Sequence, residues 1–565
     1  ALEVEQEVTD LVEASLQELP YLYKMTSKSV PGRSEIQVEV HEHYRASEVP
    51  QIWDELRRRV SEAAQRLPPG ALTPLVEDDF GDVYGILYAV SAPGYSPADI
   101  HDMARDISSG LKQVPGVAKV STAGEPEEAV HVELDNERLV RLGIPVDAVF
   151  SGIAAESQII DAGSVSFGDR RLRVAPEIAF DSVRAVGDMR IGRPGSTEIF
   201  RLADVATLSR GPVEVPPHII RFQGEPVFTV GVSLTDGVNV VDIGRDVDAQ
   251  MAQLEANLPL GVEVFSIYKQ HAVVDQAIWN FLRNLLLSVA TVVGALCLFM
   301  GWRAGPGVGS VLLLTVLGTI CIMSFRGIEL QRISLGALMI AMGMLVDNAI
   351  VVAEGMVTGV RTGLSPQAAA ERSVRRTQFA LLGATVIGLL AFAPIGLSAD
   401  KSGHFLRSLF QVVAISLLLS WVLAVTVVPL LGSYLLKAGK SAARETLYSG
   451  WGYAPYRALI RLGLRRCWSA TLIIVAITAT CLWGFGFVKQ GFCPMTDSPL
   501  FFVDYYLPEG TDIRATADEV EALEQVLMQD PSVVDVASFI GRGPARFMAT
   551  LRPEQPNPAY AHLLV

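Results

Sequence analysis

Cysteine and histidine are scarce in this sequence. Five cysteines and eight histidines occur among 565 residues, and no two cysteines form a Cys-x-x-Cys pair. We therefore expect neither a disulfide framework nor a cysteine-based zinc site. His41 and His43, in "VEVHEHY", fall on one face of an expected strand at a spacing that could hold a metal ion. Histidines on a strand are more often solvated surface residues, so we expect no metal site.

Basic residues are outnumbered, and the common catalytic motifs are missing. Lys and Arg total 46 against 61 Asp and Glu, which gives a net charge of -15 at pH 7. Nucleic acid is therefore not expected as a partner, because phosphate binding needs clustered basic residues. No Gly-x-x-x-x-Gly-Lys-Ser/Thr loop and no His-Glu-x-x-His motif is present. We expect no cofactor, no use of ATP and no enzymatic activity.

Long apolar runs are abundant instead. The mean hydropathy is +0.34, and uncharged runs dominate residues 276–488, whereas the segments before and after them have the mixed composition of soluble protein. About 20 apolar residues cross a bilayer. Six runs approach or exceed this length and are expected to be spans: 284–300, 304–325, 333–353, 378–399, 408–436 and 467–488.

The basic residues in the short loops predict the orientation of these spans. An even number of spans places both soluble parts on one side of the membrane. Alternate loops hold twelve Lys and Arg residues against four in the opposite short loops, and basic loops are cytoplasmic. The soluble parts are therefore expected outside the cytoplasm. Residues 437–466, rich in Arg, Trp and Tyr, are expected to include an amphipathic helix on the inner membrane surface.

The soluble segments repeat one pattern of elements. Three stretches, which begin at "VTDLVEASLQ", "DIHDMARDIS" and "ADEVEALEQV", predict an amphipathic helix, a strand, a turn and an alternating strand. In the third stretch the alternating strand is "ARFMATL". The stretches "DELRRRVSEAAQRLPPGALTPLV" and "DVDAQMAQLEANLPLGVEVFSI" each predict a further helix and strand. This order is that of an α+β, ferredoxin-like split βαβ module. Residues 127–211 interrupt the second module as an inserted subdomain.

These features together resemble the resistance-nodulation-division family of bacterial exporters, in its hydrophobe and amphiphile efflux branch. The resemblance is carried by "GMLVDNAIVVAE", "IRFQGEPVFTVGV" and "SADKSGHFLRSLFQVVAISLLLSWVLAVTVVPLL". It implies a proton-driven exporter of amphiphilic compounds in the bacterial inner membrane. It also implies a homotrimer that works with a periplasmic adaptor and an outer-membrane channel. The family has twelve spans, so six spans suggest that the chain covers roughly the first half. The opening residues read as an amphipathic helix, and no signal peptide is expected among them.

The resemblance assigns a role to each segment. Residues 1–75 correspond to a first periplasmic porter module, 76–126 and 212–274 to a second, 127–211 to a docking subdomain, 275–436 to five membrane helices, 437–466 to a cytoplasmic segment, 467–488 to a sixth membrane helix, and 489–565 to the start of a second periplasmic loop. A short hairpin around residues 164–173 is the expected docking arm toward a neighbouring subunit.

One expected span carries a carboxylate. Gly336, Gly343, Asp347 and Glu354 share one stripe of a helix, and small residues there allow another helix to approach closely. A charge at mid-membrane is costly and marks a functional site. Asp347 is therefore expected to face protein and to carry a proton, because its pKa depends on burial and on nearby positive charge. Family members often have a second aspartate at the next position; here it is Asn348, expected to be a hydrogen-bonding neighbour.

The substrate pocket follows from the resemblance alone. The positions that correspond to the aromatic pocket of drug-exporting relatives are Val83, Ala123 and Tyr268, of which only Tyr268 is aromatic. Phenylalanines from the rest of the second loop could compensate.

Two alternatives to drug export stay open. Three methionines close to Asp347, Met339, Met342 and Met344, could form a thioether path, as in the metal-exporting branch. The other alternative is a non-transporting sensing or protein-export accessory protein on the same membrane fold.

Overall fold

The computed structural model describes most of the chain as two compact units. The described residues are 1–41, 43–44, 48–78, 82–156, 164–168, 170–173, 182–192, 199–235, 237–300, 305–398, 401–436, 453–488 and 499–565. The first unit contains Ala1–Phe80 and Val274–Thr496, and the second contains Gly81–Val273 and Asp497–Val565.

The first unit opens with helices that pack on a two-stranded sheet. The helical segment α1 (Leu2–Val4), η1 (Glu5–Thr9) and α2 (Asp10–Gln17) precedes β1 (Leu22–Val30), β2 (Arg33–Val40) and α3 (Val49–Ala64). Helices α2 and α3 bury Leu16, Leu56 and Val60 in a shared core. The strand predicted for "ALTPLV" is wrong, because residues 71–76 form no strand. Pro74 lacks the N–H that a sheet needs, and Leu72 and Leu75 are exposed by 89% and 84%.

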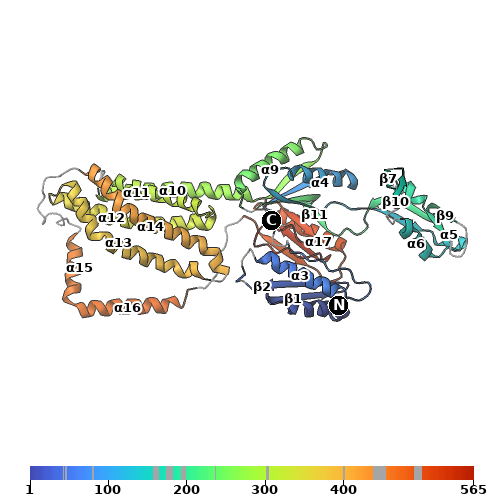
Figure 1. Ribbon diagram of the computed structural model, residues 1–565, viewed down its shortest axis with the longest axis horizontal. Helices are drawn as coiled ribbons and strands as arrows, with labels where there is room; N and C mark the ends of the chain where they lie inside the picture. Colours follow the sequence, from blue (N-terminus) through green and yellow to red (C-terminus); the bar gives the residue numbers. More distant parts are fainter. Residues whose placement is uncertain are drawn as a thin grey trace. The chain divides into compact units, whose positions relative to one another are not determined.

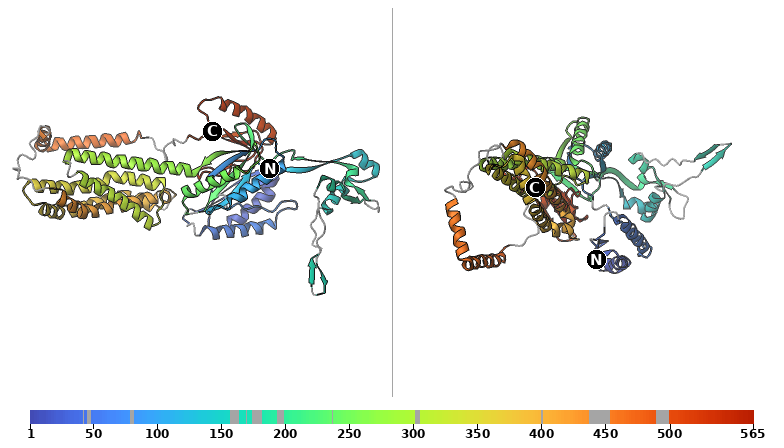
Figure 2. Two further views of the ribbon diagram at one scale, coloured as in Figure 1. Left: turned by 90° about the horizontal axis from the view of Figure 1, so that it is seen from above. Right: turned by 60° about the vertical axis from the view of Figure 1, so that its left-hand side comes forward.

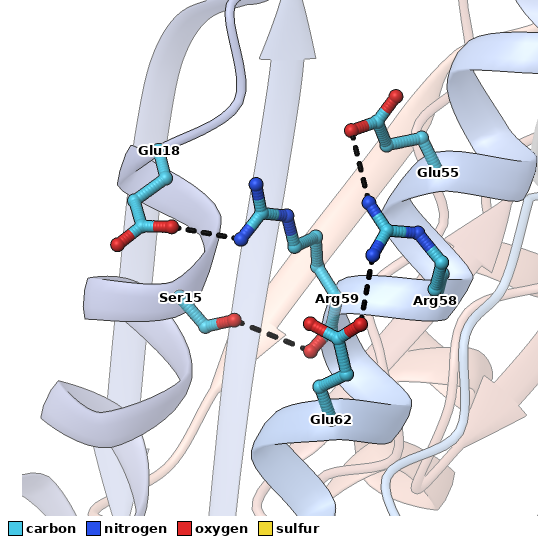
Figure 3. Close-up of polar contacts among 6 residues, drawn as sticks. All are labelled: Ser15, Glu18, Glu55, Arg58, Arg59 and Glu62. Atoms are coloured by element: carbon cyan, nitrogen blue, oxygen red, sulfur yellow. Dashed lines mark hydrogen bonds and ion pairs between the residues drawn. The ribbon is translucent and has the colours of Figure 1, made fainter.

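Polar contacts join α2 to α3 and also form within α3 (Figure 3). Ser15 donates to the carbonyl of Arg59 at 3.2 Å, and the guanidinium of Arg59 reaches Glu18 at 2.7 Å. Within α3, Arg58 bridges Glu55 and Glu62. Exposed ion pairs such as these contribute about 0–1 kcal/mol each. The buried apolar residues therefore supply most of the packing energy between these helices.

The second unit is built on one antiparallel sheet. Its elements include β3 (Ile86–Ser91), α4 (Pro97–Leu111), β4 (Val117–Ala123), β11 (Ile219–Phe222), β12 (Glu225–Leu234), α9 (Val240–Glu255) and β13 (Glu263–Lys269). Strand β12 pairs with both β3 and β4, and β3 pairs with β13, so these strands lie in the order β13-β3-β12-β4. Helices α4 and α9 cover one face of these strands (Figure 1), where Ile107, Leu111 and Val247 meet Val230 in a common core.

The last part of the chain extends the same sheet. It forms β14 (Phe502–Tyr506), α17 (Ile513–Met528), β15 (Ala537–Ile540) and β16 (Tyr560–Leu564). A tight turn at Gln223 and Gly224, with φ of 52° and 83°, joins β11 to β12, and β11 pairs with β15 on its other edge. The strand predicted at "ARFMATL" is wrong: residues 545–551 are irregular. Phe547 and Leu551 are instead buried in the core, which fixes this segment by side-chain packing.

The inserted segment between β4 and β11 has a small core of its own. It contains the strand pair β5 (Glu128–Leu134) and β10 (Ala206–Pro212). Leu139, Val149, Ile191 and Leu202 are buried together. Its other elements are α5 (Asn136–Leu142), α6 (Val146–Glu156), β6 (Ser164–Phe167), β7 (Arg170–Arg173), α7 (Val183–Gly187), β8 (Arg190–Gly192), β9 (Ile199–Arg201) and α8 (Leu202–Val205). Strands β6 and β7 form the predicted short hairpin.

Six helices among the described residues are long and apolar enough to cross a membrane, which confirms the six predicted spans. They belong to α10 (Gln270–Met300), α11 (Gly305–Phe325), α12 (Arg332–Arg361), α13 (Pro366–Leu397), α14 (Lys401–Leu435) and α16 (Cys467–Phe485). Helices α11 to α14 run side by side (Figures 1 and 2) around one apolar core. Small residues permit close contacts, since a Cβ at Gly309 or Gly318 would meet Val293 or Leu419.

The amphipathic segment predicted before α16 is partly described. Residues 453–465 form helix α15 (Tyr453–Arg465), whereas residues 437–452 lie outside the described residues. In α15 the apolar side chains of Leu459 and Leu462 are exposed by 69% and 58%.

Candidate functional site

Helix α12 has one open face that carries the membrane carboxylate. Gly343, Asp347 and Glu354 are exposed, and Gly336 is half-buried. A Cβ placed on Gly336 or Gly343 would meet nothing within 4 Å. No helix in the described part of this chain therefore covers the stripe. The described helices do not cover Asp347. That Asp347 faces protein therefore stays a prediction, and it concerns helices outside this chain.

The opposite side of α12 is tied to its neighbours. Asn348 is buried, with 7% exposure, and its amide donates to the hydroxyl of Thr385 on α13 at 3.4 Å. Ser420 on α14 donates to the carbonyl of Leu345 at 2.8 Å, and Ser373 on α13 to that of Val352 at 2.9 Å. The structure therefore links Asn348 to α13, although it follows Asp347 directly in the sequence. These contacts hold α12 while its carboxylate face stays open.

The methionines near Asp347 do not line one face. Met342 is buried and Met344 packs against the same core of the helix bundle, whereas Met339 is exposed by 42%. The prediction that His41 and His43 lie on a strand is wrong, because β2 ends at Val40 and both residues follow it in irregular chain. Their ring centroids are 5.4 Å apart, and His43 lies 4.2 Å from Tyr44. Among the described residues, no group of three His, Cys, Asp or Glu side chains could hold a metal ion.

Two of the three predicted pocket residues come together in the second unit. Ala123 and Tyr268 both pack against the core that contains Phe222 and Phe547. The Tyr268 and Phe547 ring centroids lie 5.0 Å apart. Val83 is half-buried in the segment before β3 and belongs to none of the apolar clusters formed by the described residues.

Phe547 is the aromatic residue that the sequence analysis missed. Phenylalanines elsewhere in the second loop could compensate for the missing aromatics, and within this chain Phe547 already contacts Tyr268. Its neighbour Phe502, on β14, lies 6.2 Å from it, centroid to centroid. The sequence offered no local signal, because Phe547 and Tyr268 lie far apart in the chain. The pairing of β11 with β15 and a hydrogen bond from the Tyr84 N–H to the Arg546 carbonyl bring their segments together.

The fold defines a class of protein: a membrane protein whose described residues form six long apolar helices and soluble sheet-based modules. The model of the AcrB/AcrD/AcrF family matches residues 1–554. The chain belongs to this family, which is of the resistance-nodulation-division type predicted from "GMLVDNAIVVAE" and the span order.

Curated relatives show the same kinship. Multidrug resistance protein MdtC of Pantoea ananatis (strain AJ13355) is 26% identical over 461 residues, which cover 79% of this chain and 44% of that protein. The proteins of the same name from Yersinia enterocolitica (strain NCTC 13174 / 8081) and Klebsiella pneumoniae (strain 342) are 23% and 22% identical, over 81% of this chain and 45% of each relative. The chain thus spans about half the length of the curated relatives it matches.

Proposed function

We propose that this chain is part of a proton-driven exporter of hydrophobic and amphiphilic compounds. The observation that carries the proposal is Asp347: a carboxylate close to the middle of α12, on a face that the described helices leave open. A carboxylate inside a membrane is costly unless it has a partner or a function. The names of the curated relatives, which are multidrug resistance proteins, support efflux as that function.

Asp347 acts as the proton carrier in this proposal. Burial against an apolar helix favours the protonated form, and an approaching Lys or Arg favours the ionised form. A movement of a second helix bundle along the open face would therefore load and release one proton. Asn348 does not titrate, and its contact with Thr385 keeps α12 fixed on α13 while the partner moves.

The soluble segments before and after the membrane helices form the substrate path. The strand order β13-β3-β12-β4, with α4 and α9 on one face, supports a ferredoxin-like porter module. Ala123 and Tyr268, with Phe547 added by the structure, form the apolar wall of a pocket for amphiphiles. Aromatic rings suit this role, because they offer a large apolar surface at low entropic cost.

The cellular setting follows from charge and from the family. The excess of basic residues in alternate loops supports an inner-membrane protein with its soluble units in the periplasm. The protein would work as a homotrimer, with the inserted segment at residues 127–211 as its docking subdomain and the β6–β7 hairpin as an arm toward the next subunit. A periplasmic adaptor and an outer-membrane channel would complete the path.

The test replaces Asp347 in the full-length protein. Asp347→Asn keeps the size of the side chain but removes its proton, so efflux of a fluorescent amphiphile should fall to the level of cells without the pump. The control Glu354→Gln neutralises the other carboxylate of the stripe and should leave at least half of the efflux. Asn348→Asp should have a milder effect than Asp347→Asn.

A purely structural role for Asp347 predicts the opposite result. Removing a costly buried charge is then tolerated or stabilising, and transport persists. Wild-type efflux from Asp347→Asn, at an equal amount of protein in the membrane, would rule out proton carriage by this residue.

A further inference from the structure

A carboxylate lies among aromatic rings on strand β14 of the second unit. Phe502, Asp504 and Tyr506 alternate along the strand, so their side chains leave on the same face of the sheet. They are exposed by 39%, 51% and 59%. Among the described residues β14 pairs only with β16, so it is an edge strand of the sheet. This face therefore presents one acidic group between two accessible rings.

Two buried residues on the neighbouring strand β16 hold the carboxylate from one side. Asp504 Oδ1 accepts a hydrogen bond from the Tyr560 hydroxyl at 2.6 Å and contacts His562 Nδ1 at 2.7 Å. Tyr560 and His562 are exposed by only 2% and 3%. The second oxygen, Oδ2, makes no hydrogen bond to any described residue. One oxygen of Asp504 is thus fixed by the protein, and the other stays available to a ligand.

The charge of this carboxylate is maintained. Partial burial alone would raise the pKa of Asp504, but the hydrogen bonds from Tyr560 and His562 outweigh it and hold the pKa below its ordinary value. In the described part of the chain no lysine or arginine pairs with Asp504. Burial raises the pKa of Tyr506, and the negative charges of Glu554 and Asp504 raise it further, so Glu554 adds a second negative charge near this surface. The local field therefore favours a cation.

The rings extend from this carboxylate to the aromatic wall described above. Phe502 lies 5.4 Å from the His562 ring and 6.2 Å from the Phe547 ring, and Phe547 lies 5.0 Å from Tyr268. On the other side, Tyr506 lies 4.9 Å from Tyr560. An organic cation with a flat or bulky apolar body matches this surface, because rings attract cations through their faces and Asp504 supplies the counter-charge.

We propose that Asp504, between Phe502 and Tyr506, is a binding subsite that selects organic monocations over anions of the same shape. This inference rests on the proposed export function and adds its substrate class. His562 and Tyr560 are positioning residues in this arrangement, since they hold Asp504 from the neighbouring strand and are themselves buried.

Tetraphenylphosphonium and tetraphenylborate test the proposal, because the two ions have the same shape and opposite charges. Binding is measured on the purified full-length protein in lipid nanodiscs, and export of both ions is measured in cells. Asp504→Asn keeps an acceptor for the Tyr560 hydroxyl and should weaken binding of the cation about fivefold to tenfold, with no loss for the anion. The control Glu519→Gln removes an exposed carboxylate from α17 of the same unit and should change neither affinity.

A second variant leaves Asp504 and its two hydrogen-bond partners unchanged. Phe502→Leu with Tyr506→Leu keeps apolar surface but removes the ring faces, and should weaken the cation about twofold to fivefold. An equal loss of both ions in Asp504→Asn, or an unchanged ratio of their affinities in both variants, would overturn the subsite. If the charge preference depends on Asp504 but neither ion is exported by wild-type protein, the subsite stands and the export function fails. If wild-type protein exports both ions and Asp504→Asn leaves the ratio of their affinities unchanged, the export function stands and the subsite fails.

Discussion

His218 joins the two chain segments that lead into and out of the insertion. The backbone N–H of Gly124 donates to His218 Nε2 at 2.7 Å, and nearby Val213 donates to the carbonyl of Glu127 at 2.9 Å. Gly124 has φ of +88°, and a Cβ there would lie 3.0 Å from the carbonyl oxygen of Val227, so only glycine suits this crossing. Because Nε2 accepts a hydrogen bond, His218 must be neutral for the contact to persist.

Acid should therefore weaken the contact between Gly124 and His218. Burial, with the positive charge of Arg542, lowers the pKa of His218 from 6.5, against opposing effects of Glu127 and Glu125. The unfolded chain then binds the proton at a higher pH than the folded chain, so this histidine lowers stability as pH falls through about 6.5. His218→Gln, which can still accept from Gly124, should reduce the loss of thermal stability between pH 7.5 and 5.5. The expected difference is about 1 kcal/mol, the net value of one hydrogen bond.

The control for this experiment is the exposed His101, which contacts Glu125 at 2.7 Å. His101→Gln should leave the pH dependence of thermal unfolding close to that of wild type. A His218→Gln profile that overlays wild type over the whole range would show that the crossing does not respond to protonation.

At the scale of elements, a buried ion pair joins the β11–β12 hairpin to α17. Arg221, exposed by 12%, lies 3.5 Å from Glu524, which is exposed by 1%. This distance is short enough for an ion pair. The two facing atoms, Arg221 Nε and Glu524 Oε1, nevertheless make no hydrogen bond to each other or to any other described residue. Arg221 also donates to the carbonyl of Ala517 and lies 3.4 Å from Glu521. The guanidinium thus fastens the hairpin to one face of the helix.

Removing one partner should be worse than removing both. Arg221→Met leaves Glu524 buried without its counter-ion, which costs about 3–5 kcal/mol. The double variant Arg221→Met/Glu524→Leu should recover most of that loss, since an apolar pair needs no desolvation of charge. Thermal unfolding of the purified protein measures both, with Arg514→Met as the control for an exposed arginine on α17. A double variant as unstable as the single one would show that the ion pair itself stabilises the unit.

At the scale of the whole molecule, local patterns predicted the elements but not their long-range pairing. The six spans were predictable, because each is a continuous apolar run of bilayer length. The helices of the soluble modules were predictable from their amphipathic period. Two strands were predicted wrongly where proline or core packing overrode an alternating pattern, in residues 71–76 and 545–551. Both segments have strand-like composition without a strand partner.

The candidate sites divide in the same way. Asp347 stood out in the sequence, because a charge interrupts an apolar run. Phe547 and Asp504 could not be recognised in this way, because their neighbours are distant in the sequence. Phe547 contacts Tyr268, and Asp504 contacts His562 on another strand. Pairing of β11 with β15 joins segments more than 300 residues apart. No local period encodes such a contact.

The orientation of the whole protein follows from the charge of its loops and can be tested directly. The soluble segments that precede and follow the six spans in the sequence should both be periplasmic. The loop between α12 and α13 should be cytoplasmic. Single cysteines at the exposed positions Lys112, Glu519 and Thr362, in a full-length protein whose native cysteines are replaced by serine, report each side. A membrane-impermeant maleimide applied to intact spheroplasts should label the first two and reach Thr362→Cys only after lysis. Labelling of Thr362→Cys in intact spheroplasts, with Glu519→Cys protected, would invert the topology and remove the periplasmic assignment of the aromatic wall.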